Sequence, residues 1–204
     1  MMLTQLTYTI GANSRKQKCR LSSAITVLMV AIMLMVAKVT WAESNDIVAC
    51  VACHGENGQA VEEHIPNLSG QKADYMISQL NKFRDGSRSD PDMSLIAQDL
   101  SDVQIEALAQ YYAQQPPYRR ETDENENLAG KNVSAYCISC HGIKGKTVNQ
   151  EWPDLAGQNK EYLMKQLRAL RDGSHLAPPM NDIAKKLTDQ QITDVAEYYS
   201  QKTP

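Results

Sequence analysis

Apolar residues along the chain recur at the three- and four-residue spacing of helices, and no stretch alternates in the way that strands require. This spacing predicts amphipathic helices over residues 73–84 and 160–171, and an Asp-Gly pair typical of a helix end follows the first of them. Further helices are predicted after Ser101 and after Thr188, because each opens a capping box with a glutamine three residues later. The chain is therefore predicted to be all-α.

The longest apolar run, residues 27–37, differs from these amphipathic segments. It lies within residues 1–42, which contain five basic residues and no acidic one, and which end on the small residue Ala42. A basic stretch, a short apolar segment and a small residue at the cut are typical of a secretory signal peptide. We expect a signal peptide over residues 1–42 that is cleaved near Ala42; the alternative is an uncleaved membrane anchor. Cys19 then belongs to the leader and has no role in the mature protein.

The remainder of the chain is an internal repeat. A shift of 87 residues aligns residues 48–117 with residues 135–204 without a gap and gives 30 identities in 70 pairs. Such a match predicts two copies of one structural unit. The polar and charged stretch 118–127 has no apolar periodicity and is predicted to be a linker. The expected domains are an N-terminal copy over residues 43–117 and a C-terminal copy over residues 128–204.

Each copy has only about 75 residues. We expect three helices in each copy, joined by long loops, with the first helix formed by a short run at 46–49 or 128–136. Domains of this size bury a small core and usually need an additional stabilising element. The missing core material is therefore expected to come from a group that is not protein.

A five-residue motif, C-x-x-C-H, recurs in register in both copies, at residues 50–54 and 137–141. It is the attachment signature of c-type haem. Its two thiols add to the two vinyl groups of the porphyrin as thioethers, and the adjacent histidine is thereby fixed beneath the iron as a ligand. The sequence therefore predicts two covalently bound haem c groups. The predicted attachment residues are Cys50, Cys53, His54, Cys137, Cys140 and His141.

Two other uses of paired cysteines fit less well. A thioredoxin-type disulfide requires a βαβ context, which the apolar pattern does not offer. A zinc site requires further cysteine or histidine ligands at defined spacing. The mature chain offers only His64 and His175, and neither recurs in the other copy. We expect these two histidines to be exposed surface residues.

The repeat also selects the sixth iron ligand. Iron in cytochromes c is bound by histidine and methionine, and of the four methionines beyond the leader only Met93 and Met180 occupy matching positions. Both are expected outside any helix, after loops that contain proline, where a side chain can reach a cofactor. The alternative for Met93 and Met180 is a loop methionine packed on the core. Met76 and Met164 have no matching methionine and are expected to be core residues on helix faces. The predicted iron ligands are His54, Met93, His141 and Met180.

Two prolines, Pro66 and Pro153, follow the two motif histidines at equal distance. A metal-bound histidine normally donates its second ring N–H to an acceptor, and we expect the proline carbonyl to be that acceptor. An ordinary turn proline is the alternative. The tyrosine pairs 111–112 and 198–199 are expected to pack the last helix of each copy.

Charge is distributed unevenly between the copies. The chain as a whole has a net charge of −3, and the part beyond the leader has −8, which gives no basic field to attract nucleic acid. Residues 43–117 contain twelve acidic and four basic residues, whereas residues 128–204 contain eight and ten. This asymmetry makes an electrostatic dipole that should orient the molecule in encounters. Because negative surroundings stabilise ferric iron, we expect the N-terminal haem to have the lower potential.

With these motifs in place, the whole mature chain resembles the cytochrome c4 family, the dihaem members of the class I c-type cytochromes. The resemblance rests on the two C-x-x-C-H motifs, on the P-x-L-x-G-Q runs at 66–71 and 153–158, and on the R-D-G-S and methionine segments. It implies two tandem class I cytochrome c domains, each a small helical fold around a covalently bound haem. One departure is Asp92, which stands where the C-terminal copy has Pro179.

The resemblance also implies a function: a periplasmic electron-transfer protein that shuttles single electrons to a terminal oxidase. Six-coordinate iron has no open position, so an electron carrier is expected rather than an enzyme. The implied partners are redox proteins, such as a membrane cytochrome complex and a terminal haem–copper oxidase, with peripheral association at the inner membrane. The alternatives are a dihaem subunit of a periplasmic dehydrogenase complex and a dihaem peroxidase.

Overall fold

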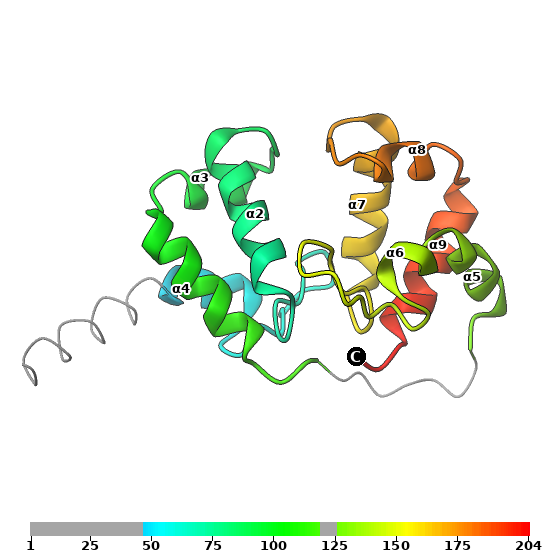
Figure 1. Ribbon diagram of the computed structural model, residues 1–204, viewed down its shortest axis with the longest axis horizontal. Coiled ribbons are helices and arrows are strands. Elements are labelled where there is room, and N and C mark those ends of the chain that lie inside the picture. Colours follow the sequence, from blue (N-terminus) through cyan, green and yellow to red (C-terminus); the bar gives the residue numbers. More distant parts are fainter. Residues whose placement is uncertain (1–46, 119–125) are drawn as a thin grey trace, which may run out of the picture. The chain divides into compact units, whose positions relative to one another are not determined.

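A computed structural model describes residues 47–118 and 126–204 (Figure 1). The predicted leader, Cys19 and most of the predicted linker lie outside these residues. The described residues are helical apart from loops, and they contain no strand, only an isolated antiparallel bridge between Arg88 and His175. None of the described helices has the length and hydropathy needed to cross a bilayer.

In the N-terminal copy, residues 47–54 are helical through the end of the C-x-x-C-H motif. Helix α2 (Ala73–Asp85) follows a long loop and ends at Gly86, whose φ of 80° closes the helix in the left-handed conformation that glycine adopts at least cost. Helix α3 (Pro91–Ala97) begins with proline in its first turn. Helix α4 (Asp102–Ala113) begins at the predicted capping box, which the structure confirms.

In the C-terminal copy, the segment before the motif divides into α5 (Leu128–Val133) and the 3-10 turn η1 (Ser134–Tyr136). The motif ends on α6 (Ile138–His141). Helices α7 (Lys160–Asp172), α8 (Met180–Ala184) and α9 (Asp189–Ser200) then repeat the order of α2, α3 and α4. The predicted capping box at Thr188 is also confirmed.

The expectation of three helices per copy was wrong, because α3 and α8 were not predicted. Helix α3 has seven residues and α8 has five, and so few residues cannot display a helical repeat of apolar positions. As a consequence, Met93 and Met180 lie within short helices rather than outside any helix. The long helices agree with the prediction to within one residue at their C-terminal ends.

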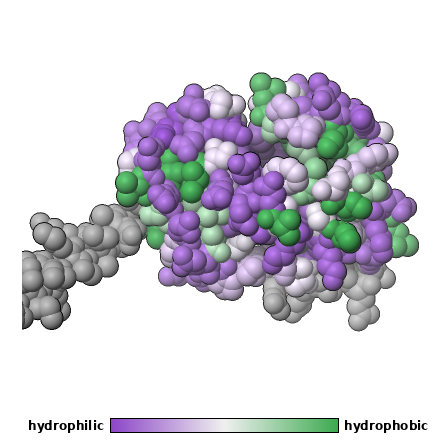
Figure 2. Space-filling model, viewed as in Figure 1, coloured by the Kyte–Doolittle hydropathy of each residue, from purple (hydrophilic) through white to green (hydrophobic). Residues whose placement is uncertain are grey.

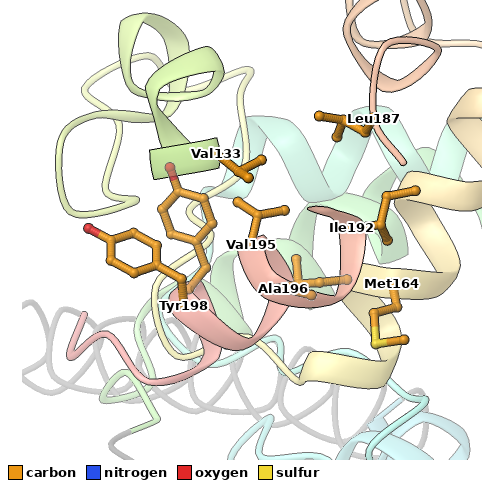
Figure 3. Packing of buried hydrophobic residues seen from close by; sticks show 9 residues of the cluster. Val133, Met164, Leu187, Ile192, Val195, Ala196 and Tyr198 are labelled. Carbon is orange, nitrogen blue, oxygen red and sulfur yellow. The ribbon is translucent and has the colours of Figure 1, made fainter. Parts of the chain in front are cut away.

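Each copy has its own apolar core. In the C-terminal copy, α9 supplies most of the buried side chains, and α5 and α7 pack against it (Figure 3). The approach of α5 to α9 is close, because a Cβ at Gly130 would lie 2.1 Å from the carbonyl oxygen of Asp194. In the N-terminal copy, Met76 of α2 packs with Tyr112 of α4. The prediction that Met76 and Met164 are core residues is confirmed, since their exposed fractions are 6% and 8%.

Reciprocal hydrogen bonds join the two copies within the unit Asp46–Pro204. The side-chain amide of Gln71 donates to the carbonyl of Asp154 at 3.0 Å and accepts from its backbone N–H at 2.9 Å. At matching positions, Gln158 donates to the carbonyl of Asn67 at 2.9 Å and accepts from its N–H at 2.7 Å. All four residues are buried. The repeated glutamines thus explain how two similar units dock through similar surfaces.

Candidate haem-binding sites

The two motif histidines have the same environment. His54 and His141 are buried, with exposed fractions of 7% and 5%. The Nδ1 atom of His54 lies 2.9 Å from the carbonyl oxygen of Pro66, and Nδ1 of His141 lies at the same distance from that of Pro153. A carbonyl can only accept, so Nδ1 carries the proton and Nε2 keeps its lone pair. The predicted role of both proline carbonyls is confirmed.

Burial also sets the protonation of these rings. Desolvation lowers the pKa of His54 and of His141, and this effect outweighs the opposing effect of the bonds to the proline carbonyls. Both imidazoles are therefore neutral at neutral pH. A neutral ring with a fixed Nε2 lone pair is the form in which histidine binds a metal.

Cys50, Cys53 and Cys140 lie on the same short helical segments as these histidines, and Cys137 directly precedes α6. None of Cys50, Cys53, Cys137 and Cys140 forms a disulfide. Burial raises the pKa of the Cys137 thiol to about 11, which keeps this thiol protonated and argues against a reactive redox cysteine. Among the residues that the structure describes, no three His, Cys, Asp or Glu side chains gather in a way that would hold a metal.

Glycines next to the motif allow the chain to turn sharply after each histidine. Gly55 has a φ of 73° and Gly142 a φ of 77°. A Cβ at either position would also lie 2.2 Å from a carbonyl oxygen of the following turn, that of Gln59 or Lys146. Only glycine fits this turn, which directs the loop toward the proline that accepts the hydrogen bond from the histidine.

Different hydrogen bonds fix the backbone around Met93 and around Met180. Met93 lies in the first turn of α3, where the carboxylate of Asp90 accepts from the backbone N–H groups of Asp92 and Met93 at 3.2 Å. Met180 begins α8, and the buried amide of Asn181 donates to two backbone carbonyls around it. Both methionines are half-buried, and α3 and α8 pack against α2 and α7 respectively.

The surroundings fit a bound haem. The hydroxyl oxygen of Tyr112 is buried without a hydrogen-bond partner in the described part of the chain, and Cys50 packs against the same small cluster. Each core is small for its copy, as expected if a planar apolar group completes it. The tyrosine pairs pack the last helices as predicted, with edge-to-face rings about 5 Å apart in both copies.

A buried polar cluster at the junction of the copies was not predicted. Arg88 is 6% exposed and donates to Gln79, to Gln166 and to the hydroxyl of Tyr162. Its guanidinium also lies 4.5 Å above the centre of the Phe83 ring. Arg88 and His175 occupy matching positions in the repeat, and the structure joins them by a backbone bridge. Their matching positions are the signal in the sequence that could have indicated this pair.

The two unmatched histidines have different environments. His64 is exposed, as predicted. The expectation that His175 is exposed was wrong: it is half-buried, its Nδ1 lies 3.2 Å from Oε1 of Gln166, and its Nε2 is buried without a partner among the described residues. Desolvation, together with the charges of Arg88 and Lys82, lowers its pKa to about 4. Residues of the other copy help to bury His175, and the sequence pattern of its own copy does not indicate such a contact.

A small all-helical fold that carries C-x-x-C-H, with a buried histidine oriented through Nδ1, defines a c-type cytochrome, and here the arrangement occurs twice. The sequence profile of the cytochrome c family matches residues 41–116 and 128–201. The chain belongs to the cytochrome c family. As expected of two such domains, it binds two covalently attached haem c groups.

Individual relatives narrow the family. The thiosulfate dehydrogenase electron acceptor of Thiomonas intermedia is 32% identical over 192 residues, covering 85% of this chain and 88% of the relative. Cytochrome c4 of Thiocapsa roseopersicina is 31% identical over 77% of this chain and 88% of its own length. The solved structure of Acidithiobacillus ferrooxidans cytochrome c4 matches with a TM-score of 0.68 and 32% identity, covering 76% of this chain and 99% of that one. The chain is thus a dihaem electron carrier similar to cytochrome c4, and not itself an enzyme.

Proposed function

We propose that this chain carries single electrons between redox proteins of the periplasm and delivers them to a terminal oxidase or another respiratory partner. In this proposal His54 and Met93 bind the iron of the N-terminal haem, and His141 and Met180 bind that of the C-terminal haem. Thioethers form at Cys50, Cys53, Cys137 and Cys140.

The observation that carries the proposal is the pair of 2.9 Å bonds from the motif histidines to proline carbonyls. Each bond leaves Nε2 as the ring's ligand atom and holds the imidazole at one angle. A bound haem supplies one reversible electron at its iron. The histidine and methionine of each copy would hold this iron, and the surrounding chain would exclude water from it. A buried, hydrogen-bonded histidine favours the same geometry in both oxidation states.

The leader and the named relatives support the proposed location. Residues 1–42 have the composition of a signal peptide, and relatives named cytochrome c4 match most of the chain. The donor is proposed to be a membrane cytochrome complex and the acceptor a haem–copper oxidase. Both are membrane proteins, which supports peripheral association of this chain with the inner membrane.

The ligand assignment is tested with Met93→Leu and Met180→Leu in the full-length holoprotein. Leucine keeps the volume and removes the sulfur. Each variant should keep two haems per chain but lose half of the methionine-to-iron charge-transfer absorption of the oxidised protein. Met76→Leu is the matched control, because Met76 is a core residue, and it should leave the band unchanged. An unchanged band in Met93→Leu or Met180→Leu would contradict the assignment.

The same spectrum tests the peroxidase alternative. A peroxidase needs an iron with an open or easily vacated sixth position, whereas the proposal requires two methionine-bound irons. If the oxidised wild-type protein shows the band for only one haem, and turns over hydrogen peroxide, the carrier function is wrong for the other haem.

A second candidate function is that of electron acceptor for a dehydrogenase. The observation that favours it is the relative in Thiomonas intermedia, which carries the name thiosulfate dehydrogenase electron acceptor. The test is to mix the oxidised protein with a purified thiosulfate dehydrogenase and thiosulfate. Reduction of both haems within the turnover time of the dehydrogenase would support this role, and reduction only by a membrane cytochrome complex would support the carrier.

A further inference from the structure

The surface around the C-x-x-C-H motif differs between the two copies. In the C-terminal copy three large apolar side chains next to the motif are exposed: Tyr136 by 57%, Ile138 by 38% and Ile143 by 78%. Their matched positions in the N-terminal copy hold smaller or charged residues. These are Ala49, Val51 and Glu56.

The charges around the motif change in the same direction. Lys144 and Lys146 are exposed in the C-terminal copy and stand where the N-terminal copy has Asn57 and Gln59. In the N-terminal copy, Glu56, Glu62 and Glu63 are exposed after the motif. We call Tyr136, Ile138, Ile143, Lys144 and Lys146 the C-terminal collar. At the five matching positions the N-terminal copy has smaller apolar residues, one acidic residue and two uncharged polar residues, and no basic residue.

Single exposed apolar side chains are common on soluble proteins and need no explanation. Figure 2 shows such hydrophobic patches on an otherwise largely hydrophilic face. The collar is different, because its three apolar side chains lie within the motif or at most two residues from it, and two lysines lie within five residues after it. An apolar centre with a charged rim is the composition of a protein interface, and tyrosine is enriched among residues that dominate binding.

We propose that the C-terminal collar is the docking surface for a redox protein whose contact face is apolar at its centre and bordered by carboxylates. The proposal rests on the electron-carrier function proposed above. Charge complementarity selects this occupant, because Lys144 and Lys146 attract a carboxylate rim, whereas Glu56 and Glu62 repel it. Docking at the collar brings the partner against the segment that holds the C-terminal haem, which is where a short electron-transfer distance is needed.

The lysines and the apolar side chains of the collar would therefore have different roles in binding. Long-range attraction by the lysines raises the rate of encounter and falls with salt, since the Debye length is about 8 Å at physiological ionic strength. The apolar side chains then stabilise the encounter complex at short range without depending on salt. Such weak, fast complexes suit proteins that must release their partner after each electron.

The experiment is an NMR titration of the reduced full-length holoprotein with a reduced acidic blue-copper protein as the probe. Chemical-shift changes are expected at residues 136–146 and not at residues 49–59. The variant Ile143→Glu/Lys144→Asn/Lys146→Gln gives three of the five collar positions the residues of the N-terminal copy. It should bind the probe at least about tenfold more weakly at low salt, because one unfavourable and two lost charges act at short range.

A reciprocal variant, Glu56→Ile/Asn57→Lys/Gln59→Lys, is the matched control. It leaves the collar intact, so binding at residues 136–146 should persist, and new shift changes should arise at residues 49–59. Haem content and the oxidised spectrum of both variants verify folding. Binding that maps to the N-terminal copy, or a first variant that binds like the wild type, would overturn the proposal.

Two further outcomes are informative. The first distinguishes a redox partner from a second copy of this chain, and the second distinguishes the docking surface from the carrier function. Self-association of the wild type without the probe, lost in the first variant, would mean that the collar binds a second copy of this chain and would also overturn the proposal. When the reduced chain is mixed instead with the oxidised probe, binding at the collar without electron exchange would contradict the proposed carrier function and leave the docking surface supported.

Discussion

A primary amide can satisfy a backbone N–H and a backbone carbonyl at the same time, and Gln71 and Gln158 both use this property across the junction. The groups that they satisfy belong to the buried residues Asp154 and Asn67. A buried polar group without a partner costs more than a hydrogen bond contributes when it is made. The glutamines therefore matter most through what their loss would expose.

Replacing Gln158 by alanine leaves the N–H and the carbonyl of Asn67 unsatisfied. We expect the free energy of unfolding to fall by about 1–3 kcal/mol for each group that water does not reach. Guanidinium denaturation of the holoprotein measures this change. Gln190→Ala on the exposed face of α9 is the control and should change stability by less than about 0.5 kcal/mol. Equal effects of the two substitutions would show that the junction bonds contribute nothing.

Single residues also show how far the sequence could predict the site. The attachment residues follow from the motif, and the proline acceptors of His54 and His141 follow from equal spacing in the repeat. His175 was predicted to be exposed because no histidine occupies its matching position in the other copy. Its burial depends on Arg88 of the other copy and on Gln166 of the preceding helix α7. Contacts between copies leave no periodic signal within either copy.

At the scale of elements, the long helices were predictable and the short ones were not. Helices α2 and α7 each have thirteen residues, enough for a repeating apolar face and a glycine stop. Helix α3 is instead specified by its start: the side chain of Asp90 caps it and Pro91 fixes the first turn. Helix α8 has no side-chain cap, although Pro178 and Pro179 precede it. Local start signals are weaker than periodicity.

The cap of α3 leads to a test at this scale. Asp90→Ala removes the acceptor for two backbone N–H groups and also breaks the 2.9 Å ion pair with Lys165 of α7. We expect a loss of about 0.5–2 kcal/mol in the free energy of unfolding from the cap. The charge-transfer absorption of the N-terminal haem should also shift, since Met93 is in the capped turn. Thermal denaturation and the oxidised spectrum measure these effects.

Asp99→Ala, an exposed turn position, is the control for Asp90→Ala. It should leave both stability and spectrum unchanged. If Asp90→Ala lowered stability with no change in the spectrum, Met93 would not depend on the cap of its helix.

Just before α5, the carboxylate of Glu126 forms ion pairs with Lys131 and Lys202 whose strength depends on pH. Hydrogen bonds from Lys131 and Lys202 lower the pKa of Glu126 to about 2. A carboxyl whose pKa is lower in the folded than in the unfolded state stabilises the fold above its ordinary pKa of 4.5, and this stabilisation is lost as the pH falls from there toward 2.

We therefore expect an NMR titration of the Glu126 carboxyl to have its midpoint near pH 2. The C-terminal residues around Lys202 should gain hydrogen-exchange rate as the pH falls through that range, after correction for intrinsic exchange. In Glu126→Gln the corrected rate should be independent of pH there. A midpoint near pH 4.5 would contradict the stabilising role of the two ion pairs of Glu126.

At the scale of the whole molecule, the dominant feature is the charge difference between the copies. Residues 43–117 have twelve acidic residues against four basic ones, and residues 128–204 have eight against ten. Ferric iron carries one more positive charge than ferrous iron, so acidic surroundings stabilise the oxidised state. We predict that the N-terminal haem has the lower midpoint potential and that electrons come to rest on the C-terminal haem.

A potentiometric titration with haem-resolved NMR signals tests this order. The gap between the two potentials should narrow as salt rises from about 0.01 to 1 M, because the Debye length falls from about 30 to 3 Å. A higher potential at the N-terminal haem would contradict the prediction. A gap that does not respond to salt would assign the difference to the haem pockets rather than to surface charge.

The reciprocal bonds between Gln71 and Asp154 and between Gln158 and Asn67 are those of a two-fold symmetric dimer. In a dimer of identical chains, any substitution appears on both halves, so an acidic face on one subunit forces the same face on the other. Covalent fusion of the two halves removes that constraint. The junction can stay symmetric while Glu56 and Ile143, at matched positions, diverge. In such a molecule the junction between the copies keeps equivalent residues on both sides, whereas the outer surfaces can differ and so give the molecule a polarity.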